Sequence, residues 1–339
     1  MMRLKRTLSR CTVPAVVLLA VAAGACAQAP IERRPASPPI ATLQLNARLV
    51  TVAVNAVDAN GAAVGDLVKD DFRLLEDGHL QKIAYFDRQD TTPLSIVLAI
   101  DTSESALRNE RLEKQAARHF IRAVLRDGKH AGQTQPADPD ELDLMEFADS
   151  VREIVPFTSN QATIDSGLSQ IQHGDATAMY DAIYLASKRL GETSAAGGRR
   201  RVLVLITDGG DTANDMNYEQ ALEQAQRAGV VLYPLILVPI YADAGRDTGG
   251  EHALIELAQE TGGKYFYIED AKDLGPALQK VTDDLRTQYV LGYYAPESTV
   301  KSRRDGLRTL NIEVTDPTAA ARIKLRYRGS YYAVKPAGA

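Results

Sequence analysis

Residues 94–105 read Leu-Ser-Ile-Val-Leu-Ala-Ile-Asp101-Thr-Ser103-Glu-Ser105, an apolar run that ends in an acid and continues with two hydroxyls at alternate positions. A short, continuous apolar run is typical of a buried strand. A second such run, Val-Leu-Val-Leu-Ile-Thr-Asp208, also ends in aspartate. Ligands of open α/β sheets bind beyond the carboxyl ends of the strands. If the two strands are neighbours, their carboxylates converge at that edge.

The pattern around these runs indicates the fold class. After Pro93, short apolar runs alternate with segments of helical period, and a helix with Pro276 in its first turn ends the series. Such alternation predicts a doubly wound α/β fold, a mostly parallel sheet with helices on both faces, over residues 93–287. The expected strands are residues 95–100, 142–147, 202–207, 230–238 and 265–268.

The flanking segments have the period of β-strands. Residues 41–92 predict a small N-terminal β module, in which a long strand (43–57) carries a bulge or register change near Leu49 and Val50 and a hairpin turns at Asp77-Gly78. Residues 288–334 predict C-terminal strands, which we expect to pack back on the first module. The strand at 321–332 has basic residues on one face, typical of a solvated face; the sharper alternative is a patch for anionic envelope polymers.

The first 27 residues resemble a secretory signal peptide, with four cations before an apolar run and Ala25-Cys26-Ala27 for cleavage. Residues 28–40 are a proline-rich linker. We therefore expect an exported protein, periplasmic or secreted, with no transmembrane span after cleavage. Lipidation of Cys26 is the alternative, but Ala23 stands where lipoprotein signals prefer Leu.

Charge bears on the class of partner. The formal charge of the 339-residue chain is −5, and it becomes −9 when the four signal-peptide cations are removed. An acidic mature protein argues against nucleic acid as a partner.

Thr177, which opens a helical segment, adds a third hydroxyl to the set at the strand ends. Hydroxyl and carboxylate oxygens suit a hard divalent cation such as Mg²⁺, Mn²⁺ or Ca²⁺, and no cysteine or histidine cluster favours zinc. A cation held largely by neutral hydroxyls keeps much of its charge. It should attract a carboxylate from another molecule into an open coordination position.

Taken in order, Asp101-x-Ser103-x-Ser105, Thr177 and Asp208 resemble the metal-ion-dependent adhesion site of the von Willebrand factor A (VWA) family, over about residues 94–285. The resemblance implies one divalent cation, held by the serines and the threonine-side loop. It implies that the aspartates act mostly through water or hydrogen bonds and that a partner's acid completes the shell. The flanking segments, with Glu76-Asp77-Gly78 before the domain and Gln288–Tyr294 after it, are similar to an exported bacterial subgroup of the family.

Each signal is weak by itself, because Asp, Ser and Thr also cap helices and Thr-Asp-Gly forms turns. We expect Glu104, where many relatives have Gly, and Asp211 at the periphery of the ligand site. The alternative for Asp211 is a loop acid or a cap for the next helix.

These features predict a non-enzymatic, adhesion-type binding protein whose partner is a protein or other ligand presenting a carboxylate, with a cell-envelope component as one candidate. One alternative is a structural periplasmic scaffold in which the metal only stabilises loops. The other is a metal-dependent hydrolase. Haloacid dehalogenase-type phosphatases place a second aspartate two positions after the first, where this chain has Ser103, and no phosphate-binding Gly-rich loop is present.

Overall fold

The computed structural model describes residues 48–89, 92–104, 110–126, 139–193, 199–238, 247–295 and 306–333. The signal peptide and linker expected at 1–40, both cysteines and Ser105 lie outside these ranges. Within them, no helix is both long and apolar enough to cross a membrane.

One sheet of six strands forms the centre of the α/β domain. Its order is β10-β9-β8-β5-β6-β7, and every neighbouring pair is parallel except β6 and β7. The five strands expected from the apolar runs are present, whereas the antiparallel edge strand β7 was not predicted. The strands are β5 (Leu94–Asp101), β6 (Glu141–Phe147), β7 (Val151–Thr158), β8 (Arg200–Thr207), β9 (Val230–Leu237) and β10 (Phe266–Ile268).

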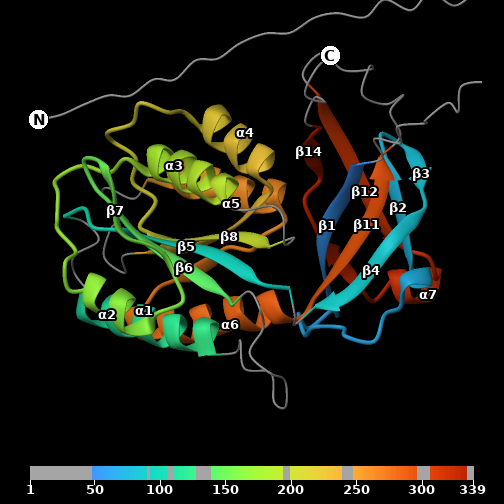
Figure 1. The fold of residues 1–339 in the computed structure, drawn as a ribbon, viewed down its shortest axis with the longest axis horizontal. Coiled ribbons are helices and arrows are strands. Elements are labelled where there is room, and N and C mark those ends of the chain that lie inside the picture. Colours follow the sequence, from blue (N-terminus) through green and yellow to red (C-terminus); the bar gives the residue numbers. More distant parts are fainter. Residues whose placement is uncertain are drawn as a thin grey trace, which may run out of the picture. The chain divides into compact units, whose positions relative to one another are not determined.

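Helices cover both faces of this sheet (Figure 1). Alternate residues of β5 serve the two faces: Leu98 packs in one core with Phe120, and Val97 in the other with Met179. The first face carries α1 (Glu110–Arg126), α2 (Gln161–Gly167) and α6 (Leu274–Arg286), preceded by the short turn η4 (Ala271–Asp273); the second carries α3 (Met179–Glu192), α4 (Tyr218–Ala228) and α5 (Thr248–Thr261).

The flanking segments form two further four-stranded sheets, β13-β1-β11-β4 and β14-β12-β2-β3. Strands from before and after the α/β domain alternate in the first sheet, whereas in the second sheet two strands from after the domain lie beside two from before it. Val52, Leu74 and Leu291 belong to one buried core. Their elements are β1 (Arg48–Val57), η1 (Lys69–Asp71), β2 (Phe72–Glu76), β3 (His79–Gln81), β4 (Ile83–Gln89), β11 (Gln288–Ala295), β12 (Leu307–Val314), α7 (Pro317–Ala320), β13 (Lys324–Arg326) and β14 (Ser330–Tyr332).

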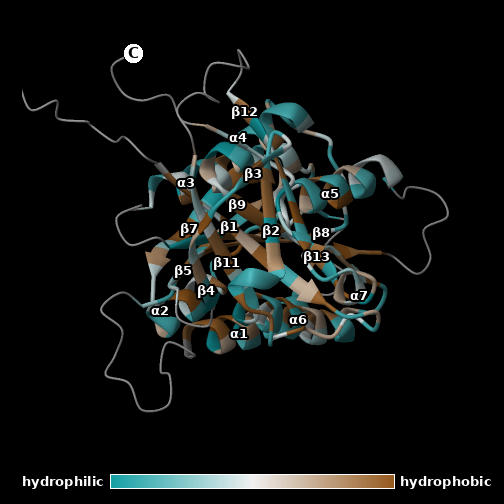
Figure 2. Cartoon of the chain, turned by 90° about the vertical axis from the view of Figure 1, so that its right-hand side faces the viewer, coloured by the Kyte–Doolittle hydropathy of each residue, from teal (hydrophilic) through white to brown (hydrophobic). Residues whose placement is uncertain are grey.

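The fold class predicted from the sequence is thus confirmed, and Figure 2 shows mostly apolar strands inside polar helix surfaces. The hairpin turns at Asp77 and Gly78, whose φ values of 47° and 79° suit a tight turn. The bulge expected near Leu49 was wrong, since β1 pairs with β11 without a shift across Leu49 and Val50. Leu49 is an outward residue whose side chain lies over Gly292, and this apolar contact mimicked a change of register.

Candidate metal site

Two strand ends bring the first site residues together. β5 and β8 are parallel neighbours with Ile100 opposite Ile206, so Asp101 and Asp208 leave the same edge of the sheet. The hydroxyl of Thr207 donates a hydrogen bond of 2.6 Å to Asp101 Oδ2, and the N–H of Ser103 donates one of 3.0 Å to Oδ1. Both oxygens of this buried carboxylate are therefore oriented by neighbours.

The loop after β5 is tied to the loop that carries Thr177. Ser103 forms a parallel bridge with Gly174, whose N–H donates to the carbonyl of Thr102 at 3.2 Å. Asp149 fixes the next residues by accepting hydrogen bonds from the N–H groups of residues 175 and 176 at 3.0 and 3.2 Å. Segments more than 70 residues apart in the sequence, around 103 and 175, are thereby held side by side.

Thr177 and Asp208 face the same small space. A Cβ atom placed on Gly210 would lie 3.2 Å from Asp208 Oδ1 and 3.7 Å from Thr177 Oγ1. The N–H of Gly210 donates to Asp208 Oδ1 at 3.0 Å, and that of Thr177 donates to the Thr212 hydroxyl at 2.9 Å. The structure thus brings Asp101, Ser103, Thr177 and Asp208 to one edge of the sheet.

Asp211 serves the start of α3. The N-cap position of that helix is Ala178, which has no capping side chain. Asp211 instead accepts a hydrogen bond from the N–H of Met179 at 3.2 Å, and Asn214 accepts one from Tyr180 at 3.1 Å. Thr177 is therefore not the cap of this helix, and Asp211 is engaged as part of a cap supplied by another loop.

Residues 96–211, which contain this constellation, match the sequence profile of the von Willebrand factor type A domain. The chain contains a VWA domain. No curated protein matches the chain.

Solved structures that align with part of this chain include proteins from bacteria and a mussel. An aerotolerance-related membrane protein from Bacteroides fragilis is 24% identical over 56% of this chain and 98% of its own, with a TM-score of 0.41. Mussel proximal thread matrix protein 1, with a zinc-occupied adhesion site, is 18% identical over 62% of this chain and 49% of its own (TM-score 0.47). The VWA domain of the pilus tip protein Mfa5 from Porphyromonas gingivalis is 11% identical over 57% of this chain and 95% of its own (TM-score 0.46).

The VWA edge gathers buried acids that resist ionisation. Burial, with a contribution from nearby Asp208, raises the pKa of Asp101 to about 6, although hydrogen bonds from Thr207 and Ser103 oppose the shift. Burial, followed by the charge of Asp101, raises the pKa of Glu113 in α1 to about 8. Both shifts have the sign expected where acids are buried close to one another without a compensating cation.

Glu113 is the feature that the sequence analysis missed. Its side chain is 5% exposed, and its Oε1 atom has no hydrogen-bond partner among the described residues. A signal for it existed, because Glu113 stands in helical register with the buried Ala116, Ala117 and Phe120. An acid within the buried stripe of a helix is costly unless something pairs with it.

The residues present fit a divalent cation. No group of three or more His, Cys, Asp or Glu side chains in the described ranges is arranged to hold a metal ion, so acids alone do not make the site. The oxygen set consists of the hydroxyls of Ser103 and Thr177 with the carboxylates of Asp101 and Asp208, which is the chemistry that Mg²⁺ prefers. Glu113 also has a buried, unpartnered oxygen beside this set, and a nearby cation would favour its ionised form.

Proposed function

We propose that the VWA domain binds one divalent cation at this edge and uses it to bind an acidic group of a partner protein or other ligand. The single observation that carries the proposal is the convergence of Asp101 and Asp208 from adjacent strands, with Ser103 and Thr177 beside them. Ser103, Ser105 and Thr177 would supply hydroxyl oxygens. Asp101 would act mainly by orienting Ser103, since both its oxygens already accept hydrogen bonds.

The proposed cation is Mg²⁺, with Mn²⁺ or Ca²⁺ as the other candidates for an all-oxygen shell. Because two ligands are neutral hydroxyls, the cation would retain charge for a carboxylate of the partner. Glu104 is exposed beside the site and would repel acidic ligands, so we place it as a modifier of ligand choice. We further propose that the chain belongs to the exported subgroup and acts in the periplasm or outside the cell, with its partner in the cell envelope.

Binding is favoured over catalysis by the residues around the site. Ser103 stands where a dehalogenase-type phosphatase would need its acid–base aspartate, and Thr102, Ser103 and Thr177 are all buried within the loops that hold them. A scaffold role, with a metal that only stabilises the loops, remains the second candidate because the loop network of Asp149 and Thr212 would support it equally.

Isothermal titration of metal-stripped protein with Mg²⁺ and Mn²⁺ tests the metal. We expect one site per chain, abolished by Ser103→Ala. The matched control is Ser187→Ala, since Ser187 in α3 is equally buried (0% against 2% for Ser103). Absence of binding by the wild-type protein, or equal loss in the two variants, would contradict the metal site.

The partner is tested by capture from a cell-envelope extract on immobilised wild-type protein, with and without a chelator. Capture that needs the metal and is lost in Ser103→Ala supports the ligand site. A metal-dependent rise in thermal stability with no metal-dependent capture would instead establish the scaffold role.

A further inference from the structure

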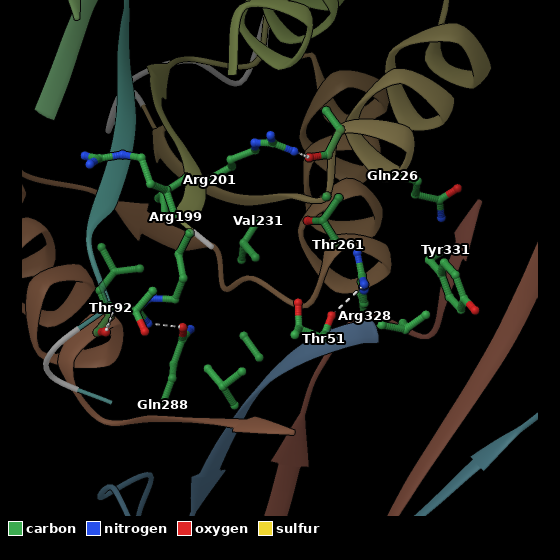
Figure 3. A pocket seen from close by; sticks show the side chains of 18 of the residues that line it. Thr51, Thr92, Arg199, Arg201, Gln226, Val231, Thr261, Gln288, Arg328 and Tyr331 are labelled. Carbon is green, nitrogen blue, oxygen red and sulfur yellow. Dashed lines mark hydrogen bonds between the residues drawn. The ribbon is translucent and has the colours of Figure 1, made fainter. Parts of the chain in front are cut away.

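A cavity of about 600 Å³ lies at the opposite end of the parallel sheet from the metal site (Figure 3). Pro93 and Arg200, at the starts of β5 and β8, line it together with Thr51 of β1 and Gln288 of β11. Its volume is within the range of about 300–1,000 Å³ that is usual for small-molecule sites. None of the described residues of the proposed metal site contributes to it.

The lining of this cavity is strongly basic, although the chain as a whole carries a formal charge of −5. Among the described residues, the lining includes Arg199, Arg200, Arg201, Arg227 and Arg328 and a single acid, Asp87. Figure 3 shows that Arg199 extends away toward β5, whereas Arg201 and Arg328 approach the hollow from different sides. A concave, basic surface concentrates the field of its charges and attracts anions.

Arg200 and Arg201 are held by neutral acceptors. Arg200 donates to Gln288 Oε1 at 2.5 Å and to the carbonyl of residue 285 at 2.6 Å. Arg201 donates to the carbonyls of residues 228 and 193 at 2.8 and 3.0 Å. Among the described side chains, no carboxylate forms an ion pair with either guanidinium. Their charges are therefore fixed in place by hydrogen bonds without being neutralised by contact.

The acids nearest to Arg200 already have partners. Asp140 pairs with Arg286 at 2.6 Å, and Asp284 pairs with Arg326. Arg200, Arg286 and Arg326 therefore carry one positive charge more than Asp140 and Asp284 can balance. Burial lowers the pKa of Arg200 to about 10, and the Nε atom of Arg200 is buried with no partner in the described part of the chain.

We propose that this cavity binds a small molecule carrying an oxyanion, phosphate or carboxylate, whose charge is balanced by Arg200 and Arg201. Guanidinium groups match the geometry of both oxyanions, and a bound anion would compensate the buried positive charge. Gln226 and Arg328 complete the polar wall, and Tyr331 provides an aromatic surface beside them (Figure 3). The site is independent of the metal at the other end of β8.

The competing explanation is purely structural. Arg200 joins the α/β domain to the flanking sheets by bridging β8 to β11 through Gln288, and Arg328 fastens the flanking sheets internally by donating to the carbonyl of Thr51 at 2.7 Å. If this were their only role, small anions would have no saturable effect on the protein.

Isothermal titration of the metal-stripped, full chain with pyrophosphate and with citrate separates the two explanations. Removing the metal prevents citrate from being captured at the VWA edge. We expect one molecule bound per chain, with affinity reduced roughly ten- to a hundredfold by Arg201→Gln, as for loss of a charged hydrogen-bonding partner. Tighter binding of pyrophosphate assigns a phosphate ligand, and tighter binding of citrate assigns a carboxylate.

Arg201→Gln removes contacts to two carbonyls and could fail to fold, so a rim variant provides a second test. Arg227 lies at the cavity, its side chain 47% exposed and paired with Glu223; Arg122 in α1 is 46% exposed and paired with Asp165. Arg227→Gln should weaken binding severalfold, whereas Arg122→Gln should leave it unchanged. No binding of either probe at millimolar concentration, or equal weakening by the two rim variants, would overturn the proposal.

Discussion

Replacement of Glu113 by Gln should stabilise the metal-free protein, which is an unusual expectation for a buried residue. The pKa of Glu113 rises from its ordinary value of 4.5 to about 8 on folding. An acid with a raised pKa binds more protons in the folded than in the unfolded state, so its ionisation opposes folding. Stability contributed by the protonated form is lost as pH rises from 4.5 through 8.

The magnitude follows from the two pKa values. At pH 7 the difference in proton binding corresponds to about 3 kcal/mol, and at pH 4.5 it is close to zero. Glu113 is 5% exposed, so solvent screens little of this penalty. Gln has nearly the same shape and cannot ionise. We therefore expect Glu113→Gln to raise the free energy of unfolding by up to about 3 kcal/mol at pH 7.

Urea denaturation of wild-type and variant proteins in a chelating buffer, at several pH values from 4.5 to 8, measures the difference. Glu110→Gln is the control, because Glu110 is only half-buried on the same helix and its pKa is lowered, first by the hydrogen bond from Lys114. That variant should be slightly less stable than wild type near neutral pH. A Glu113→Gln difference that is negative, or that does not grow with pH, would refute the assignment of an uncompensated buried charge. Saturating Mg²⁺ should shrink the gain, since the cation would balance the same charge.

Three further changes test other contacts at the site. Asp211→Ala removes part of the α3 cap, so it should cost about 1 kcal/mol of stability, measured as a lower denaturation midpoint, while Mg²⁺ binding persists. Loss of Mg²⁺ binding with unchanged stability would show that Asp211 acts on the metal instead. Gly174→Ala places a Cβ 2.1 Å from Asp149 Oδ2 and 2.8 Å from the Cβ of Ala148, so it should displace the Thr177 loop and cost about 1–3 kcal/mol of stability. Calorimetry should then show weaker Mg²⁺ binding, and unchanged affinity would argue that this loop supplies no metal ligand. Glu104→Gln should leave stability within about 0.5 kcal/mol and strengthen capture of an acidic partner at low salt; unaltered capture would place Glu104 outside the ligand's path.

The sequence predicted best those elements whose own residues form a clear local pattern. Two apolar runs ending at Asp101 and Asp208, set between segments of helical period, predicted buried strands of a parallel sheet, and β5 and β8 are indeed neighbours. β7 escaped prediction because only Val155 of its eight residues is fully buried, so the strand lacks a continuous apolar run. The α3 cap escaped because Asp211 and Asn214 act on a helix more than 30 residues earlier, a contact that no local signal encodes.

The sequence could not predict the charge balance at Glu113 or in the arginine-lined cavity. Their chemistry depends on which charges remain uncompensated after folding, and that depends on partners distant in sequence. Arg286 lies 146 residues from its partner Asp140, and Arg200 lies 88 residues from Gln288. The sequence pattern can place a charged residue on the buried face of a helix, as at Glu113. It does not identify the residue of opposite charge that lies beside it in the fold.

The chain leaves the flanking sheets after β4, forms the α/β domain and returns to them at β11. β4 and β11 are hydrogen-bonded neighbours, with Gln89 opposite Gln288. The domain is therefore an insertion that enters and exits at a single point. Tension applied between residues 48 and 333 would be carried by the flanking strands, and the inserted domain would not lie in series with it. A load applied through a ligand at Asp101 and Asp208 would instead pull on β4 and β11 together, at the edge of a sheet whose hydrogen bonds resist that pull collectively.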